Sequence, residues 1–391
     1  TSTQFGYKQP LLVYKLIPLM FSTKNLFLPK GTFVSRLVCL SLFLLISIPI
    51  YAQERESIPH FDGNLKFSLN DDGSQWIAFH TYGQFWGRFN ENNPGSLLSE
   101  EIQQNTYDVS IRRFRLGIQS QVTERLFTYL QFGINNLNYL SPRGTSLDIL
   151  DAYAEYSFSN ALEVGGGKTA WTGLSRYSAP NTSKLLTYDL VQLALPTTDE
   201  TDDLIRKLSV YTKGQVGRLD YRYILSKPFS ANNSLAFDGE LLENIAKFNG
   251  RTDNAIHSAY VKWQFIDLES NKIPFSDGTY LGAKTIFNIG IGGEYRNDGL
   301  SSLQNGIETD HDIRLFAVDA FLDIPVNPAK NTVFTSYLGY FDYDFGPNYL
   351  RNAGVNNPVL EVDSQLASFN GAGNAFPKVG TGRSWSLQAG Y

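Results

Sequence analysis

The chain has 391 residues, of which 42% are hydrophobic and 14% aromatic, with one Cys, one Met, 33 Gly and 16 Pro. The formal charge is −5, but residues 1–52 hold five of the 33 basic groups and no acidic group, which leaves 28 basic against 38 acidic groups, or −10, in residues 53–391. These counts exclude a disulfide scaffold, a collagen and a disordered acidic tail, and the acidic body argues against nucleic-acid binding, which requires phosphate neutralisation.

The N-terminal region is typical of an export signal. After Met20 a basic stretch reaches Arg36, and an apolar run of about 14 residues follows at positions 37–50. This run is too short to cross about 30 Å of hydrocarbon as a helix, and Tyr51-Ala52 offers a cleavage site. We therefore expect residues 20–52 to be a cleaved signal peptide, with an uncleaved membrane anchor as the alternative. Residues 1–19 are expected to be translated upstream sequence. The only Cys, Cys39, lies inside the apolar run, so the mature chain would contain none.

Residues 53–75 are polar and are expected to form a periplasmic lead-in without strands. No apolar stretch of 18 residues follows, so no transmembrane helix is predicted there. Instead, segments of 8–15 residues alternate between apolar and polar side chains, which is typical of strands with one apolar and one polar face. The twelve predicted strands are 76–89, 107–121, 127–136, 148–158, 162–169, 207–214, 218–226, 256–266, 285–296, 312–323, 332–343 and 384–391.

Alternation by itself fits a β-sandwich as well as a barrel. On the second segment, Phe114, Leu116 and Ile118 alternate with Arg113 and Arg115. The charged side chains of such a strand face solvent in a sandwich and face water inside a pore. In a barrel the apolar side chains face lipid. We accordingly expect lipid contact for three further apolar side chains on other strands: Phe132, Leu225 and Ile289.

The lengths of the connections favour the barrel. Long and short gaps alternate along most of the chain, with long loops at 90–106, 170–206, 227–255, 297–311 and 344–383. The gap 267–284 departs from this pattern, because a tight turn is expected there. Short turns on one rim and long loops on the other are typical of outer-membrane barrels, and only a closed sheet leaves no unpaired backbone in lipid. So many long loops are unusual in a sandwich. The sequence predicts an all-β transmembrane antiparallel barrel in residues 76–391, with about 12 strands present.

Aromatic side chains are frequent near the ends of the predicted strands. Such positions suit the girdles that flank the lipid-facing band of a barrel, although aromatic residues also fill the cores of ordinary β proteins. The candidates for these girdles are Trp76, Tyr82, Trp86, Phe89, Phe127, Tyr156, Phe158, Trp263, Phe265, Tyr340, Phe341 and Tyr343.

Three stretches resemble a known family. Residues 111–118, IRRFRLGI, followed by residues 127–132, FTYLQF, resemble early paired strands of the phosphate-selective porin O and P family, especially its Bacteroidetes-type members. Residues 162–168, LEVGGGK, resemble the strand that leads into the inward-folding loop of that family, and residues 376–391 resemble a late strand. The resemblance implies a homotrimeric porin in the bacterial outer membrane.

The same resemblance implies a barrel of up to 16 strands. About four strands would then follow Tyr391, and the chain would be a fragment that is incomplete at its C-terminus. The alternative is that Trp385, Leu387, Ala389 and Tyr391 form a complete C-terminal strand that ends in an aromatic residue.

Parity along the strands predicts which charged side chains face the lumen. Arg on the lipid face at the bilayer midplane costs about 2–4 kcal/mol, so these side chains are expected inside. Two interpretations remain open: a basic ladder for anions in which Arg113 and Arg115 lead, or ion pairs that brace the barrel. Nearby acids depart from a strong basic ladder. The predicted pore-lining residues are Arg88, Arg113, Arg115, Asp151, Glu155, Asp220, Arg222 and Lys262.

The segment 170–206 is the best candidate for a constriction loop. It is among the longest connections and follows the fifth predicted strand, where general porins fold a loop inward. Its candidate eyelet residues are Trp171, Arg176, Tyr177, Lys184 and Tyr188. The alternative is a loop on the outer surface. Gly165–Gly167 with Lys168 lacks the remaining glycines and the strand-to-helix context of a phosphate-binding loop.

No catalytic residue, metal site or cofactor is predicted. The acidic clusters at 199–203 and 308–312 do not match a calcium loop and are expected to be solvated, and the four His residues show no zinc-ligand spacing. His257 and Ser258 are adjacent on a strand and therefore face opposite sides. We expect an outer-membrane porin that lets small hydrophilic solutes, including anions such as phosphate, diffuse passively. The alternatives are a phospholipase-like barrel enzyme and a secreted β-sandwich binding module.

Overall fold

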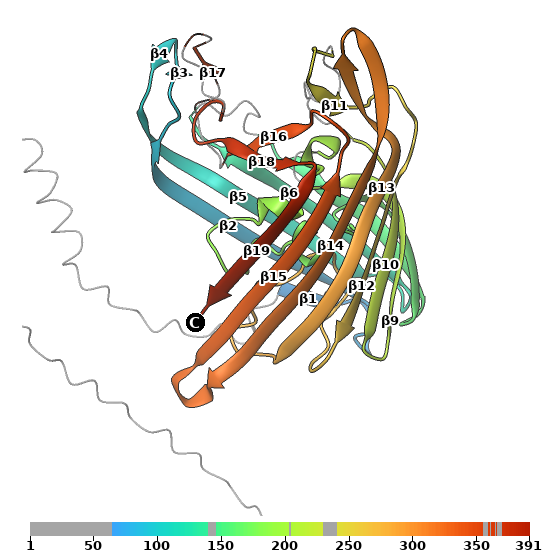
Figure 1. Cartoon of the computed structure of the whole chain (residues 1–391). Coiled ribbons are helices and arrows are strands. Elements are labelled where there is room, and N and C mark those ends of the chain that lie inside the picture. The colour runs from blue at the N-terminus through green and yellow to red at the C-terminus, as the bar shows by residue number, and fades with distance from the viewer. Residues whose placement is uncertain are drawn as a thin grey trace, which may run out of the picture. The chain divides into compact units, whose positions relative to one another are not determined.

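A computed structural model describes residues 65–139, 146–202, 205–229, 241–354, 359, 361–363, 365 and 370–391 (Figure 1). These residues belong to one compact unit that begins at Phe61. The predicted signal peptide, the upstream sequence and most of the predicted lead-in lie outside the described residues. The described part of the chain contains no helix that is long and apolar enough to cross a membrane.

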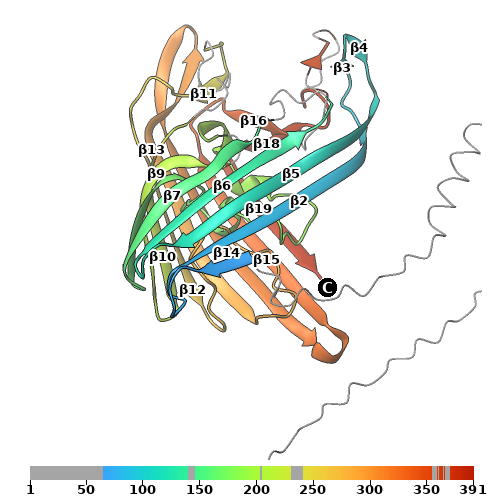
Figure 2. The same cartoon turned by 180° about the vertical axis from the view of Figure 1, so that it is seen from behind.

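The architecture is one 14-stranded antiparallel sheet whose strands follow chain order. Figures 1 and 2 show that its long strands run side by side around a common interior. The twelve long strands, here called the wall strands, are β2 (Trp76–Glu91), β5 (Asn105–Gln121), β6 (Leu126–Leu137), β7 (Asp148–Ser159), β8 (Leu162–Thr169), β9 (Lys207–Val216), β10 (Leu219–Lys227), β12 (Ile256–Gln264), β13 (Ile286–Gln304), β14 (Ile307–Asn327), β15 (Thr332–Asp344) and β19 (Gly382–Gly390).

All twelve predicted strands are present, and the fold class is confirmed as an antiparallel β-barrel wall. One predicted long loop, 297–311, is wrong. β13 and β14 continue through it and are joined by the two residues Asn305 and Gly306, which both have positive φ. Asn-Gly with two positive φ angles is typical of a tight hairpin turn.

Shorter elements lie at the long-loop rim and at one edge of the sheet. β1 (Leu65–Ser68) pairs with β2, so the predicted lead-in contains a strand, contrary to expectation. β11 (Ala246–Phe248) pairs with the upper part of β13. Two small sheets comprise β3 (Ser96–Leu98), β4 (Glu101–Ile102) and β17 (Glu361–Val362), and β16 (Leu350–Ala353) with β18 (Phe376–Gly380). Four short 3-10 helices are η1 (Arg176–Ser178), η2 (Gln192–Ala194), η3 (Thr198–Glu200) and η4 (Pro328–Lys330).

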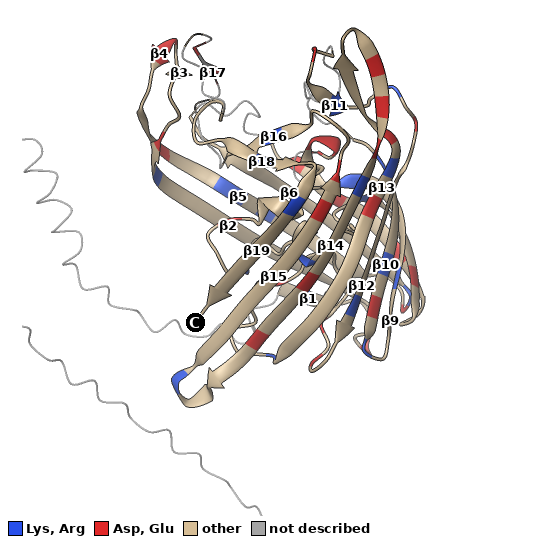
Figure 3. Ribbon diagram, viewed as in Figure 1, with Lys and Arg blue, Asp and Glu red and all other residues tan. Residues whose placement is uncertain are grey.

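Along much of the wall, apolar side chains face outward. On β5, Tyr107 and Val109 are 79% and 82% exposed, whereas the intervening Asp108 and Ser110 are buried. Figure 3 shows basic and acidic positions along wall strands such as β5, β12 and β14. Ile289 is exposed, and Phe132 and Leu225 belong to neither interior apolar cluster. The predicted facing is confirmed, and the β-sandwich alternative is wrong because the apolar side chains do not meet in a core between two sheets.

Half of the aromatic residues predicted for the girdles face the interior of the barrel and not the lipid. Trp76, Tyr82, Trp86, Phe127, Phe341 and Tyr343 lie on the interior parity of their strands, whereas Phe89, Tyr156, Phe158, Trp263, Phe265 and Tyr340 lie on the outer parity. Proximity to a strand end does not determine which face of the sheet a ring occupies. Alternate side chains face opposite sides, so strand phase decides it.

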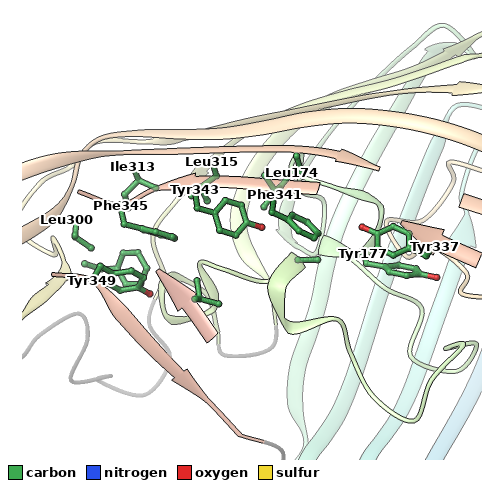
Figure 4. Close-up of a cluster of buried hydrophobic side chains, with 14 of the residues drawn as sticks. Leu174, Tyr177, Leu300, Ile313, Leu315, Tyr337, Phe341, Tyr343, Phe345 and Tyr349 are labelled. Atoms are coloured by element: carbon green, nitrogen blue, oxygen red, sulfur yellow. The ribbon is translucent and has the colours of Figure 1, made fainter. Parts of the chain in front are cut away.

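The interior is only partly ionic. β14 and β15 present Phe321, Tyr337 and Phe341 inward, and these pack with Leu174 and Tyr177 from segment 170–206 (Figure 4). The expectation that ionic groups surround the whole interior is therefore wrong on this side of the barrel. A segment that folds into the lumen buries its own apolar side chains, and these pack against apolar side chains of the wall.

The strand pairing shows which strands form the two edges of the described sheet. β19 pairs with β15 on one side, and the outer partner of β2 is the four-residue β1. Backbone groups in hydrocarbon must be hydrogen-bonded, so a membrane-embedded sheet requires a partner at each edge. Trp385 and Leu387 of β19 are exposed, in keeping with an outer face toward lipid.

Candidate functional site in the lumen

The segment 170–206, here called the constriction loop after its predicted role, enters the interior directly after β8. Trp171, Arg176 and Tyr177 are each at most 3% exposed. The Arg176 backbone N–H donates to Asp319 Oδ2 on β14 at 2.7 Å, and the ring of Tyr177 lies 4.2 Å from that of Tyr337 on β15. The loop therefore reaches the wall opposite to the strand from which it starts.

Two glycines allow the loop backbone to lie directly on the wall. A Cβ at Gly173 would stand 2.1 Å from the backbone N of Ala259 on β12, and one at Gly292 on β13 would stand 2.2 Å from the carbonyl O of Gly173. Arg222 on β10 donates through Nε to the neighbouring carbonyl O of Thr172 at 2.6 Å. Loop and wall thus meet backbone to backbone, with no side chain between them.

We expect Gly173→Ala to displace the constriction loop. The new methyl group overlaps backbone atoms that cannot rotate away, and such overpacking costs about 1–3 kcal/mol. Single-channel conductance should rise because the displaced loop narrows the lumen less. Gly87→Ala is the matched control, since a Cβ at that position meets nothing within 4 Å. Equal conductance and equal stability of the two variants would contradict this docking.

A second segment enters the interior from the short-turn rim. Residues 265–285, here called the inserted turn, connect β12 to β13, and this explains why the predicted tight turn at 267–284 is absent. The inserted turn pairs with the constriction loop through a parallel bridge between Pro180 and Ser276. Ser276 N donates to Ala179 O at 2.9 Å, and Asn181 N donates to Ser276 O at 2.8 Å. The two segments brace one another inside the barrel.

Glu269 is the central anchor between these segments. Both of its carboxylate oxygens accept from Arg176 at 2.7 Å, and Lys262 on β12 lies 3.0 Å away. Tyr280 Oη donates to it at 2.6 Å and Asn288 Nδ2 at 2.5 Å. Burial raises the pKa of Glu269, but the cationic Arg176 and Lys262 outweigh burial and hold that pKa well below its usual range.

Asp189 fixes the constriction loop to the opposite side of the lumen. Its carboxylate accepts from Arg113 at 2.6 Å and from Arg112 at 3.0 Å, both on β5. Burial raises the pKa of Asp189, but the two guanidinium groups lower it more, so the pKa stays below its ordinary value. The loop is therefore anchored at Glu269 and at Asp189.

The lowered pKa of Asp189 predicts a pH response. A depressed carboxyl pKa stabilises the docked loop above the ordinary Asp pKa of about 4, and this stabilisation is lost as pH falls through the depressed value. Ion selectivity should therefore be constant from pH 8 to pH 5 and change only in more acidic solution. Asp189→Asn should remove that acid transition in reversal-potential measurements. A transition between pH 5 and pH 8 that disappears in Asp189→Asn would contradict the assignment.

A cavity of about 290 Å³ lies between β2, β5 and β6 on one side and the two inserted segments on the other. Its basic lining includes Arg112, Arg113 and Arg115 of β5, with Asp189 as the acid that faces them. Arg115 donates to Asn135 Oδ1 and to the carbonyl O atoms of Phe114 and Ile134 at 2.6–3.0 Å. Among the described residues it forms no salt bridge.

The other predicted pore-lining residues face the interior and are mostly paired. Two of them form hydrogen bonds without a salt bridge among the described residues: Arg222 donates to loop carbonyls, and Asp220 accepts from Gln215 at 2.8 Å. Sequence parity identified the faces of these residues but not their partners. The salt bridges are Arg88 with Asp108 at 2.5 Å, Asp151 with Arg206 at 2.9 Å, Glu155 with Lys213 at 3.1 Å, and Lys262 with Glu269 at 3.0 Å.

The predicted eyelet residues separate into two groups. Trp171, Arg176 and Tyr177 are buried where the loop docks on the wall. Lys184 and Tyr188 are exposed: Lys184 Nζ lies 2.7 Å from the carboxylate of Asp277, and the Tyr188 ring lies beside Trp86. The first three residues thus hold the loop in place, and the other two reach open space.

The acidic clusters expected to be solvated are largely paired with cations. In the first cluster Asp199 pairs with Arg351, Glu200 with Arg296 and Asp202 with Lys168; in the second, Glu308 and Asp310 pair with Arg251 and Asp312 with Arg314. In the described ranges no group of three His, Cys, Asp or Glu residues is placed to hold a metal ion.

Histidine contacts bear on the enzyme alternative. His257 lies 2.7 Å from Tyr223 Oη and is exposed, whereas the adjacent Ser258 is buried on the other face, as strand parity predicts. Ser302 Oγ lies 2.7 Å from His311 Nε2 on the β13–β14 hairpin. The convergence of Ser, His and acid that the alternative requires is not formed around these histidines in the described part of the chain.

Part of the chain resembles a known protein family. Residues 79–203 match the family described as phosphate-selective porin O and P. No curated protein sequence matches the chain. Similar solved structures include OprB of Pseudomonas putida at high pH (12% identity, TM-score 0.43, 69% of this chain and 68% of that chain), Salmonella typhi OmpF with daunomycin (10%, 0.23, 80% and 96%) and Vibrio cholerae OmpT in its trimer form (11%, 0.21, 79% and 98%).

The family match covers β5, β6 and β7, most of β2, all of β8 and most of the constriction loop. It therefore includes Arg112, Arg113, Arg115 and Asp189, which face one another across the cavity. Residues 79–203 are therefore similar to the phosphate-selective porin O and P family.

Proposed function

We propose that this chain forms a porin of the bacterial outer membrane, through which small hydrophilic solutes diffuse passively with a preference for anions. The observation that carries the proposal is the combination of an outward apolar face with an interior that is narrowed by the constriction loop and lined by excess arginine. A pore makes no bonds, and its selectivity depends on its width and its electrostatic profile.

Bracing and selectivity occupy different residues of the lumen. Glu155 and Asp151 neutralise Lys213 and Arg206, so these pairs contribute mainly to the rigidity of the wall. The cavity is also lined by Arg206 and Arg351, but there the three guanidinium groups of β5 face the single lining carboxylate, that of Asp189. A cleft that is lined by one sign of charge, with low-dielectric walls, concentrates ions of the opposite sign.

Export and assembly complete the proposal. Residues 20–52 act as a cleaved signal peptide, and the mature chain assembles as a homotrimer, which rests on the family resemblance alone. The pore also requires a partner for β19 and for the part of β2 that β1 leaves uncovered, because a sheet with open edges is not stable in hydrocarbon. These edges pair with each other or with further strands.

Conductance across planar lipid bilayers tests the proposed function. The purified chain should produce discrete current steps in KCl, and the reversal potential in a salt gradient should show that chloride permeates more readily than potassium. Heat-denatured protein serves as the control. Absence of current steps, or a preference for potassium, would reject the proposal.

A further inference from the structure

We infer that the cavity between β5 and the inserted segments binds organic anions that combine a carboxylate with an apolar body, in preference to inorganic phosphate. The inference rests on the proposed porin function and names the class of solute that the constriction selects. It depends on the two unlike faces of the cavity, which come from different parts of the chain.

The basic face comes from the wall. Arg113 and Arg112 share the carboxylate of Asp189, whereas Arg115 is held by neutral acceptors only, namely Asn135 Oδ1 and two backbone carbonyl oxygens. Arg115 is 5% exposed, so its charge is largely desolvated and lacks a carboxylate partner among the described residues. A planar guanidinium in this state is suited to a carboxylate or another oxyanion.

The apolar face comes from the inserted segments. Leu190, Leu195 and Ile205 of the constriction loop and Ile273 and Phe275 of the inserted turn line the cavity, beside the polar Asn181, Thr182, Ser183, Gln192 and Thr198 of the same loop. Phe275 also packs against the ring of Tyr129 at 6.4 Å, and the Arg206 guanidinium lies 5.3 Å from the Phe275 ring. None of the five apolar side chains carries a hydrogen-bond donor.

These faces discriminate between anions. Inorganic phosphate presents oxygen on every side, so wherever it meets the leucine, isoleucine and phenylalanine side chains of this lining it leaves polar atoms unpaired, which is unfavourable. An organic carboxylate can place its charged end at Arg115 and its apolar end against Phe275. The cavity of about 290 Å³ is large enough, because a benzene ring occupies an apolar cavity of about 150 Å³.

Current block by three anions tests the inference. Benzoate, acetate and inorganic phosphate are added to the full chain conducting KCl in planar bilayers. Benzoate should block at a concentration about tenfold lower than acetate or phosphate, since it uses both faces. Arg115→Gln should weaken the benzoate block about tenfold, and Phe275→Ala should weaken the benzoate block without changing the acetate block. Stronger block by phosphate, or equal block by benzoate and acetate, would overturn the inference while leaving the porin function intact.

Matched controls lie on the outer face of β14. Arg314→Gln and Phe316→Ala alter exposed side chains away from the lumen and should leave every block unchanged. If the chain carries no current, the porin function fails, and calorimetric binding to the detergent-solubilised chain decides the inference instead. Benzoate binding that is lost in Arg115→Gln and is stronger than phosphate binding would support the inference, and absence of benzoate binding would overturn it.

Discussion

Glu269→Gln should release the constriction loop and destabilise the barrel by about 3–5 kcal/mol, because removing one partner of a buried ion pair leaves the other charge uncompensated. Two buried cations, Arg176 and Lys262, depend on this carboxylate. Arg176 belongs to the constriction loop, Glu269 to the inserted turn and Lys262 to the wall, so one substitution loosens all three. Urea unfolding of the purified chain measures the loss, and higher, noisier single-channel current reports the freed loop.

Two further variants make the Glu269 experiment decisive. Glu308→Gln removes a carboxylate from an exposed pair with Arg251 and should change stability by at most about 1 kcal/mol. The double variant Arg176→Gln with Glu269→Gln should lose less unfolding free energy than the sum of the losses in the two single variants, because it removes both members of the buried pair. A Glu269→Gln variant as stable as Glu308→Gln, with unaltered current, would show that Glu269 does not hold the loop.

The double substitution Arg113→Gln and Arg115→Gln should remove most of the anion preference. The cavity then retains Arg112, which Asp189 balances, and Arg206 and Arg351, which pair with Asp151 and Asp199. Two unit charges 4 Å apart interact by about 1 kcal/mol in water and about 4 kcal/mol at an effective dielectric constant of 20. The ratio of anion to cation permeability should therefore fall at least about fivefold.

Reversal potentials in a KCl gradient measure this change. Arg314→Gln is the matched control, because Arg314 is exposed on the outer face of β14 and pairs with Asp312. The loop should remain docked in the double variant, since Arg112 still binds Asp189 and Arg176 still binds Glu269. A shift no larger than that of Arg314→Gln would assign Arg113 and Arg115 to bracing alone.

The strands could be predicted because their period of two is a local property. Alternation at Phe114 and Arg115 reports the face of each side chain without knowledge of its neighbours. The β13–β14 hairpin could also have been found, since Asn305-Gly306 is a strong turn signal. A long loop is predicted at 297–311 because this polar stretch lacks apolar residues at alternate positions. Strand segments that extend beyond the lipid need no such apolar face.

The anchors of the lumen could not be predicted in the same way. Arg176 and Glu269 are 93 residues apart, and Arg113 and Asp189 are 76 apart. Their pairing depends on two segments that fold into the barrel from opposite rims. Sequence parity therefore predicted the faces of the basic groups but could not distinguish a basic ladder for anions from ion pairs that brace the barrel. The structure separates paired arginines such as Arg206 from Arg115, which has only neutral partners.

Thiol accessibility at two adjacent positions of β5 tests most directly whether ionic side chains line a water-filled interior. The outer-parity Ile118 and the cavity-lining Gln119 are both half-buried, and the only native Cys is Cys39. In membranes, a charged, impermeant thiol reagent should modify Gln119→Cys, with a step in conductance, and should spare Ile118→Cys. Modification of Ile118→Cys with Gln119→Cys protected would mean that the faces of the wall are reversed.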